Sequence, residues 1–367
     1  MRPKGAKFEK GEKEMEKESI DFLKQLINAP SPSGFEGPVR KIWQKRMERF
    51  ADEVRVDLQG NVIATLNPDG KPRVMLAGHC DEVGFMVRYI NDEGFVYFVP
   101  IGGVDPGIVS ARRVRIHTKR GVVFGVVGRK AIHMMDNEER KKVPKYHQLW
   151  IDIGAKDKKE GESIVSVGDP IVFDQGFQEL RGKLVVGRGF DDRVGSFAVG
   201  ETLRLLSQAY PKASVYAVAT VQEELGMRGA RTSAFGISPK VGIAVDVDNS
   251  TDYPDSENKE KFGELTLGGG PVIARGANIN PVVETLLVET AQREKIPYQI
   301  AGEPAGTGTD ANVIQITREG VAAGLVSIPN RYMHTPVEII SLEDLENVSR
   351  LLASFIMQID ETTDFTP

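Results

Sequence analysis

The sequence predicts an α/β protein in which a domain built on a mixed sheet is interrupted by an all-β insertion. In the first and last parts of the chain, apolar runs alternate with segments of helical spacing. That pattern is typical of a largely parallel or mixed sheet covered by helices on both faces. Between about residues 84 and 183, short runs rich in Val, Ile and Phe are punctuated by glycine and proline turns, which predicts a small barrel or sandwich.

The length of 367 residues favours two domains, and the pattern places their boundaries. Residues 1–17 mix Lys and Glu with almost nothing to bury, so we predict a charged tail there. We assign residues 18–83 and 184–367 to the α/β domain, and residues 84–183 to the inserted β domain.

The helices and strands of the α/β domain are predicted from the spacing of apolar residues and from the proline and glycine residues that end each element. Apolar residues at helical spacing begin near Ser19 and stop at the Pro-rich segment 29–34, and a second amphipathic helix covers 37–50. Ser341 is a plausible N-cap for the last helix, with Asp344 at its third helical position. The remaining patterns predict strands at 53–58, 62–66, 74–77, 215–221, 241–247 and 321–328, and helices at 193–208, 281–295 and 342–359.

Composition excludes several classes of protein. The formal net charge of -5 gives no reason to expect a nucleic-acid partner. No apolar run approaches the roughly 20 residues that a membrane-spanning helix needs. The charged N-terminal segment lacks the apolar stretch of a secretory signal, and the single cysteine, Cys80, fits a reducing compartment. We therefore expect a cytoplasmic protein with no membrane partner.

Potential metal ligands lie in five segments at or just past predicted strand ends, or before a helix. In open α/β sheets, ligands bind outside the carboxyl ends of the strands, where neighbouring loops converge. Each segment alone has an ordinary explanation, such as a structural histidine, a helix cap or a solvated turn. Their common setting is more specific than any one of them. The residues are His79 and Asp81, Asp191 and Asp192, Glu223 and Glu224, Asp246 and Asp248, and His334.

These residue types suit two divalent cations. Imidazole and carboxylate are good zinc ligands, and two histidines with three carboxylates can serve two ions if one carboxylate bridges them. Two such ions activate water and polarise a scissile carbonyl. Because Glu223 and Glu224 are adjacent, one can bind metal while the other stays free as a general base.

Seven stretches together resemble the tetrahedral (TET) aminopeptidases, a family of dinuclear metallopeptidases that includes glutamyl and deblocking aminopeptidases. The stretches run in family order from about Ser31 to Glu338, so the resemblance covers nearly all of the chain after the charged tail. It implies a zinc-exopeptidase-like α/β/α catalytic domain with an inserted β dimerisation domain. The stretches are SPSGFEG, AGHCDEVGFMV, GRGFDDRVG, VQEELGMRGA, AVDVD, GTGTDA and IPNRYMHTPVE.

The resemblance also implies a role for each site residue. His79 and Asp246 bind one metal, Glu224 and His334 bind the other, and Asp191 bridges both. Glu223 is the general base, which takes a proton from the attacking water and passes it to the leaving amine. Asp81, on the same strand face as His79, orients that histidine. The peptide bond between Asp191 and Asp192 is expected to be cis, as in related enzymes.

The expected activity is removal of N-terminal residues from short peptides, with zinc or cobalt as the metal and manganese as a further option. By resemblance, the β insertion mediates dimer contacts, and the dimers assemble into a hollow tetrahedral dodecamer. Two alternatives remain open: a cellulase-like glycoside hydrolase, because relatives carry that label, and a non-catalytic assembly or peptide-binding protein with a structural metal. The first leaves the histidines unexplained. The second does not explain Glu223.

Other candidates carry less weight. Cys80 should point away from His79 into the core, and Asp248 is expected to be a turn carboxylate. The histidines of the insertion, His117, His133 and His147, are not expected to touch the metals. For the glycine-rich runs 268–270 and 306–310, close approach to substrate and simple tight turns are equally good explanations.

Overall fold

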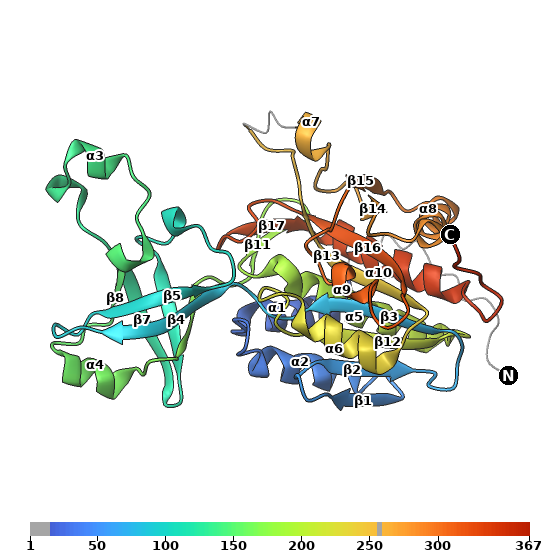
Figure 1. Ribbon diagram of the computed structural model, residues 1–367, viewed down its shortest axis with the longest axis horizontal. Coiled ribbons are helices and arrows are strands. Elements are labelled where there is room, and N and C mark those ends of the chain that lie inside the picture. The colour runs from blue at the N-terminus through green and yellow to red at the C-terminus, as the bar shows by residue number, and fades with distance from the viewer. Residues whose placement is uncertain (1–14, 255–258) are drawn as a thin grey trace.

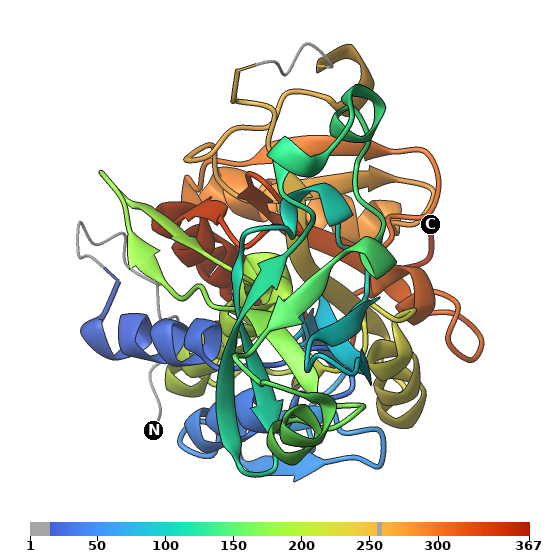
Figure 2. The ribbon, with the colours of Figure 1, turned by 90° about the vertical axis from the view of Figure 1, so that its left-hand side faces the viewer.

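The computed structural model describes residues 15–254 and 259–367, so most of the charged tail predicted at 1–17 lies outside the described residues. The described chain forms a large α/β body, from one end of which a β-barrel projects (Figure 1). Seen from the barrel end, the two short helices of the barrel lie at its opposite ends (Figure 2). These helices are α3 (Asn137–Arg140) and α4 (Lys158–Ile164). The mixed α/β body with an inserted β structure confirms the predicted fold class.

The body is built on an eight-stranded sheet with the order β1-β2-β12-β3-β13-β16-β14-β15. The four central strands β12, β3, β13 and β16 run parallel, whereas antiparallel pairing joins β1 to β2, β2 to β12 and β14 to β16. The sheet is therefore mixed, as predicted. Its strands are β1 (Glu53–Val56), β2 (Val62–Leu66), β3 (Arg73–His79), β12 (Ser214–Thr220), β13 (Val241–Asn249), β14 (Val272–Gly276), β15 (Gln299–Glu303) and β16 (Ala322–Asn330).

Helices cover both faces of this sheet because its central strands are apolar on both sides. Successive residues of β3 show this: Val74 and Leu76 join the core under one helical layer, and Met75 and Ala77 join the core under the other. The first layer contains α1 (Lys17–Asn28), α2 (Gly37–Met47), α5 (Phe190–Ala209), α8 (Pro281–Glu294) and α10 (Leu342–Met357). The second contains α6 (Arg228–Ile237) and α9 (Ala311–Ile314), and the short α7 spans Lys259–Phe262.

The insertion forms a closed six-stranded barrel with the order β4-β5-β8-β7-β6-β9 and a core of its own. Beyond β9, the strands β10 (Gln178–Glu179) and β11 (Leu184–Gly187) pair in a small sheet with β17 (Glu338–Ser341) of the body. The chain has thus returned to the body by β11. The barrel strands are β4 (Gly84–Ile90), β5 (Val96–Ile101), β6 (Arg113–Thr118), β7 (Gly121–Gly128), β8 (Trp150–Asp152) and β9 (Pro170–Phe173).

Local details also follow the sequence. Ser341 caps α10, its hydroxyl accepting from the backbone N–H of Glu343. The predicted start of the helix at 193 differs from the start of α5 at Phe190, because Asp191 and Asp192 have non-helical backbone angles and only the residues after them form a regular helix. The peptide bond between Asp191 and Asp192 is cis, as expected. Within the described ranges, no helix is long and apolar enough to cross a membrane.

A buried charge cluster holds the two connections between body and barrel. Glu82 lies between β3 and β4, where the chain leaves the body, and its carboxylate accepts from Arg188, just after β11, and from Arg193 of α5. All three side chains are at most 2% exposed. Arg193 also donates to backbone carbonyls at the end of α1, and the N–H of Ser31 donates to Glu82. Burial alone would raise the pKa of Glu82, but Arg188 and Arg193 hold it below its usual value.

We expect Glu82→Gln to destabilise the chain by about 3–5 kcal/mol, because it leaves two buried guanidinium groups without an anion. Since the folded pKa of Glu82 is depressed, its contribution is present above the unfolded pKa and is lost as pH falls through the folded value. Urea unfolding measured between pH 3 and 7 tests both points. Glu179→Gln, in an exposed pair with Lys24, is the matched control and should change stability by less than about 1 kcal/mol. Equal midpoints for the two variants would contradict the role of the cluster.

Candidate metal centre

The predicted site residues meet at the carboxyl edge of the four parallel strands. His79 is the last residue of β3, and Asp246 lies on the neighbouring strand β13. Glu223 and Glu224 follow β12, and His334 follows β16. Asp191 reaches the same edge from the irregular start of α5. The convergence follows from topology, since parallel neighbours bring their carboxyl ends to one side of the sheet.

Two groups of possible ligands form there and share one carboxylate. The ligand atoms of His79, Asp191 and Asp246 all lie within 4.8 Å of one another, and so do those of Asp191, Glu224 and His334. Asp191 faces both groups: its Oδ1 lies 3.1 Å from His79 Nε2, and its Oδ2 lies 3.1 Å from His334 Nε2. The structure therefore brings together all five residues predicted as metal ligands.

The electrostatics of the site suit cations. Burial, together with the negative charge of Asp191, raises the pKa of both Asp246 and Glu224. Glu224 Oε1 is buried and lies 3.3 Å from His334 Nε2. Divalent cations would offset this concentration of negative charge and lower those pKa values. The donor set of two imidazoles and several carboxylates thus fits a pair of borderline-soft divalent metals.

The imidazole rings of His79 and His334 both lie against carboxylates. Burial opposes the charged form of each ring, yet hydrogen bonds with carboxylates outweigh it. Asp191 and Asp81 raise the pKa of His79 well above its usual range, and Asp191 and Glu224 raise the pKa of His334 to about 11. The same contacts hold the pKa of Asp191 well below its usual value despite its burial. Metal binding at these rings therefore competes with protons.

Asp81 connects the first group to the two glutamates. His79 Nδ1 lies 3.2 Å from the carbonyl oxygen of Asp81 and 3.4 Å from its Oδ1. The Asp81 carboxylate also accepts from the backbone N–H groups of Glu223 at 3.0 Å and Glu224 at 3.3 Å, and from the hydroxyl of Ser33 at 2.6 Å. One buried carboxylate thus contacts the first imidazole and fixes the backbone of the loop after β12.

Glu223 lies beside the two groups without belonging to either. Its Oε2 is 4.0 Å from His79 Nε2. Burial, with the nearby charges of Asp246 and Asp310, raises the pKa of Glu223 to about 9. This carboxylate therefore reaches the edge of the candidate metal centre while remaining free of it.

Three carboxylates near the site were not assigned a role from the sequence. Glu338 accepts from the backbone N–H groups of Asp191, at 3.1 Å, and of His334, at 2.9 Å, and so supports the shared carboxylate and a ligand of the second group. Asp192 accepts from the N–H of His79 at 3.0 Å. Asp310, within the glycine-rich run 306–310, accepts from the hydroxyl of Thr220 at 2.6 Å. Glu338 and Asp310 lie inside two of the seven motif stretches, which was the one signal available for them.

The remaining candidates lie apart from the two groups. Cys80 is fully buried in the body core, as predicted. Asp248 lies within strand β13 and not in the turn predicted for it, and its carboxylate accepts from the N–H of Asn249, the next residue. Within residues 15–254 and 259–367, no other cluster of His, Cys, Asp or Glu has a geometry suited to a metal, and the histidines of the barrel belong to neither group.

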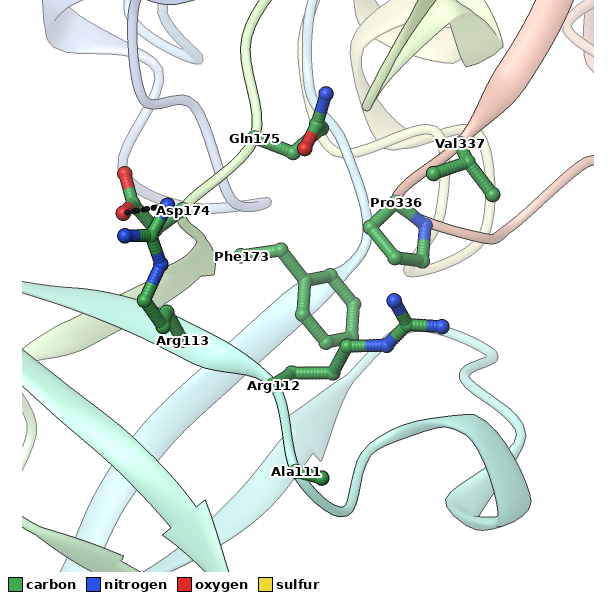
Figure 3. Close-up of a pocket in the computed structure, with 8 residues that line it drawn as sticks. All are labelled: Ala111, Arg112, Arg113, Phe173, Asp174, Gln175, Pro336 and Val337. Atoms are coloured by element: carbon green, nitrogen blue, oxygen red, sulfur yellow. Dashed lines mark ion pairs between the residues drawn. The ribbon is translucent and has the colours of Figure 1, made fainter.

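A cavity of about 210 Å³ lies beside the His334 loop, at the seam between barrel and body (Figure 3). The ring of Phe173 points into it, Arg112 extends toward Pro336, and Arg113 pairs with Asp174 at 3.5 Å. Pro336 and Val337 come from the segment just after His334. The barrel therefore faces the loop that carries a candidate ligand.

The fold and this edge of the sheet define a class of peptide hydrolase, the aminopeptidases with an α/β catalytic domain and an inserted β domain. A TET aminopeptidase from a marine sediment archaeon of the Thaumarchaeota superposes with a TM-score of 0.89 at 36% identity, covering 94% of this chain and 98% of that one. The Pyrococcus horikoshii TET1 peptidase, which can assemble into a tetrahedron or a large octahedral shell, gives 0.83 at 31% identity over 93% and 100% of the two chains. A Thermotoga maritima protein described as an endoglucanase gives 0.74 at 31% identity over 92% and 96%.

The chain belongs to the M42 glutamyl aminopeptidase family, whose model matches residues 60–351. A lysyl aminopeptidase of Pyrococcus furiosus is 37% identical over 350 residues, which cover 95% of this chain and 99% of the relative. The resemblance seen in the seven sequence stretches is thereby confirmed. M42 peptidases are metallopeptidases, and the two groups described above are the candidate metal sites of this chain.

We expect variants to separate the two groups by metal content. Asp191→Asn should remove both ions because its carboxylate faces both groups, whereas His334→Ala should remove about one ion per chain. Asp248→Asn changes a neighbouring carboxylate outside the groups and should leave the content unchanged. Zinc per chain, measured by atomic emission after dialysis, tests this. If His334→Ala lost both ions, or Asp191→Asn kept both, the shared-carboxylate arrangement would be wrong.

Proposed function

We propose that this chain is a metal-dependent aminopeptidase that removes N-terminal residues from short peptides with two divalent cations in one site. The observation that carries the proposal is the position of Asp191, whose two oxygens face two separate sets of imidazole and carboxylate ligands. A single structural ion would need only one such set. A shared carboxylate between two sets is what a site for two ions requires.

In this proposal, His79 and Asp246 would hold one cation, Glu224 and His334 the other, and Asp191 both. Two divalent cations, when bound there, polarise the scissile carbonyl and activate a water molecule. Glu223 takes a proton from the attacking water as the C–O bond forms, and delivers it to the amine as the C–N bond breaks. Its place beside the ligands, without membership of either group, suits that role.

Asp81 has a positioning role in this mechanism. Its contacts with His79 Nδ1 fix the ring so that Nε2 faces Asp191. Its bonds to the N–H groups of Glu223 and Glu224 set the direction of both carboxylates. The buried side chain of Asp81 therefore helps to position three residues of the site: the ligand His79, the ligand Glu224 and the base Glu223.

The metal, the assembly and the location belong to the same proposal. Imidazole and carboxylate ligands favour zinc or cobalt, with manganese also acceptable. We propose a homo-oligomer in which the insertion at 84–183 mediates dimer contacts and dimers form a dodecamer. Alternate residues of β7, Val122, Phe124 and Val126, leave an apolar stripe on the outside of the barrel, which supports such a contact. The single buried cysteine supports a cytoplasmic location.

The alternatives explain less of the site. A glycoside hydrolase uses two carboxylates on either side of a sugar bond and needs no imidazole ligand. Here His79 and His334 both face the shared carboxylate of Asp191. A protein with a purely structural metal leaves Glu223 without a purpose, although its backbone is held in place by Asp81.

We expect Glu223→Gln to reduce kcat by at least about 100-fold, the contribution of a positioned general base, with nearly intact metal content. Glu224→Gln is the matched comparison one residue away: it should lose activity together with about one ion per chain. Activity on amino-acid anilides and zinc content, measured on the same samples, test this. Unchanged turnover in Glu223→Gln would remove that residue from the mechanism.

We also expect hydrolysis to require a metal and a free N-terminus. Dialysis against a chelator should abolish activity, and added zinc, cobalt or manganese should restore it to different extents. A panel of amino-acid anilides, N-acetylated counterparts and carboxymethylcellulose separates the hypotheses. Cleavage of the acetylated compounds at the same rate as the free ones would contradict the requirement for a free N-terminus, and chelator-insensitive release of sugar would establish the glycosidase.

A further inference from the structure

The two imidazoles of the site are held from different parts of the molecule. His79 Nδ1 contacts Asp81, two residues along the same chain segment. His334 Nδ1 lies 2.8 Å from the carbonyl oxygen of Gly103, which belongs to the loop after barrel strand β5. A carbonyl oxygen can only accept, so this contact requires the proton on Nδ1 of His334. Nε2, which faces Asp191 and Glu224, is then the ring nitrogen left to bind a cation once its own proton leaves.

The neighbouring glycine packs against the same group. Gly102 has a φ of +74°, and a Cβ built there would lie 2.9 Å from Val83 Cγ1 and 3.3 Å from Glu224 Oε2. The left-handed backbone and the absence of a side chain are both needed for the loop to approach this closely. The turn of Gly102 and Gly103 therefore contacts two of the three residues of the second group, Glu224 and His334.

The barrel fixes the position of this turn. Val104, the next residue, is 8% exposed and packs in the barrel core. Its carbonyl oxygen accepts from the hydroxyl of Tyr146 at 2.6 Å, and the Tyr146 ring packs against Phe85 and Phe98 of the same core. Further along, Asp105 caps the short helix that follows. The Gly103 carbonyl is thus anchored to the barrel, on the opposite side of the seam from His334.

We propose that the Gly102–Gly103 turn of the barrel positions the second metal group, by fixing the tautomer and direction of His334 and by packing on Glu224. This rests on the proposed function and extends it: the inserted domain supplies a positioning contact to the active site of its own chain. The first group, held by Asp81, does not depend on this turn. Loss of the turn should weaken one of the two cation sites and spare the other.

The experiment measures zinc affinity by equilibrium dialysis of the full chain after chelation. Gly102→Ala should keep one tightly bound ion and weaken the second about 10–100-fold, the usual cost of losing an outer-sphere partner. Gly154→Ala is the matched control, because Gly154 is also in the barrel domain with a φ of +77°, and a Cβ there meets nothing within 4 Å. It carries the same backbone penalty and should bind both ions as the wild type does.

A second comparison identifies the weakened group. In an Asp246→Asn background, where the second group is the one left intact, adding Gly102→Ala should reduce the affinity of the remaining ion by the same 10–100-fold. Tyr146→Phe retains the ring but releases the Val104 carbonyl, and should lower the same affinity by about tenfold. Tyr210→Phe, which loses a hydroxyl contact to Asp52 in the body, is its control. If Gly102→Ala does not fold, Tyr146→Phe decides the question.

The outcomes separate this inference from the proposed function. A wild-type chain that binds no zinc overturns both. A wild-type chain that binds two ions, with Gly102→Ala equal to Gly154→Ala and Tyr146→Phe equal to Tyr210→Phe, overturns the inference alone. Equal weakening of both ions in Gly102→Ala also overturns it, since a general structural defect would act on both groups. Selective loss at the second group supports it.

Discussion

The buried cluster of Glu82, Arg188 and Arg193 is the constraint on which the rest of the structure depends. It lies where the chain leaves the body for the barrel and where it returns, and it also anchors the end of α1. Removing three charges from water is costly, so the geometry must be well satisfied for the fold to tolerate it. Glu82 is three residues after His79, and Arg193 is two residues after Asp191. The same cluster therefore fixes the elements that carry the first imidazole and the shared carboxylate.

The site itself is a set of like charges that the backbone holds together. Asp81, Asp192 and Glu338 each accept backbone N–H bonds from residues of the site. These bonds fix where the carboxylates and imidazoles of the ligand groups lie before any ion binds. Such preorganisation reduces the rearrangement needed on binding, and the surplus negative charge favours cations. Asp191 is central because it is a member of both groups.

Much of this arrangement could be predicted from the sequence, since it depends on local patterns. The long apolar runs give the central strands, and polar residues just past their ends, such as Glu223 and His334, mark the edge where loops converge. Near Gly84 the sequence changes to short runs rich in Val, Ile and Phe separated by glycine and proline turns, and this change predicts the inserted β domain. The seven motif stretches then assign roles that spacing alone leaves open. The cis peptide bond at the start of α5 was expected only from the family resemblance, because two aspartates before a helix are ordinarily explained as caps.

The supporting contacts could not be predicted, for a physical reason. Glu338 and Asp310 are ordinary carboxylates until the fold buries them, and their hydrogen bonds are to backbone or hydroxyl groups distant in sequence. The contact between Gly103 and His334 joins residues 231 apart through a main-chain carbonyl, which no residue type can reveal.

That contact also changes how the barrel is understood. A pure assembly module could be removed without altering the chemistry of the body. The barrel of this chain could not be removed in that way, because its Gly103 carbonyl holds the His334 ring. A movement between barrel and body would reorient His334 and leave His79 in place. The cavity beside Pro336 and Val337 shows that packing along this seam is incomplete. The short loop after β5 therefore couples the position of the barrel to the orientation of His334.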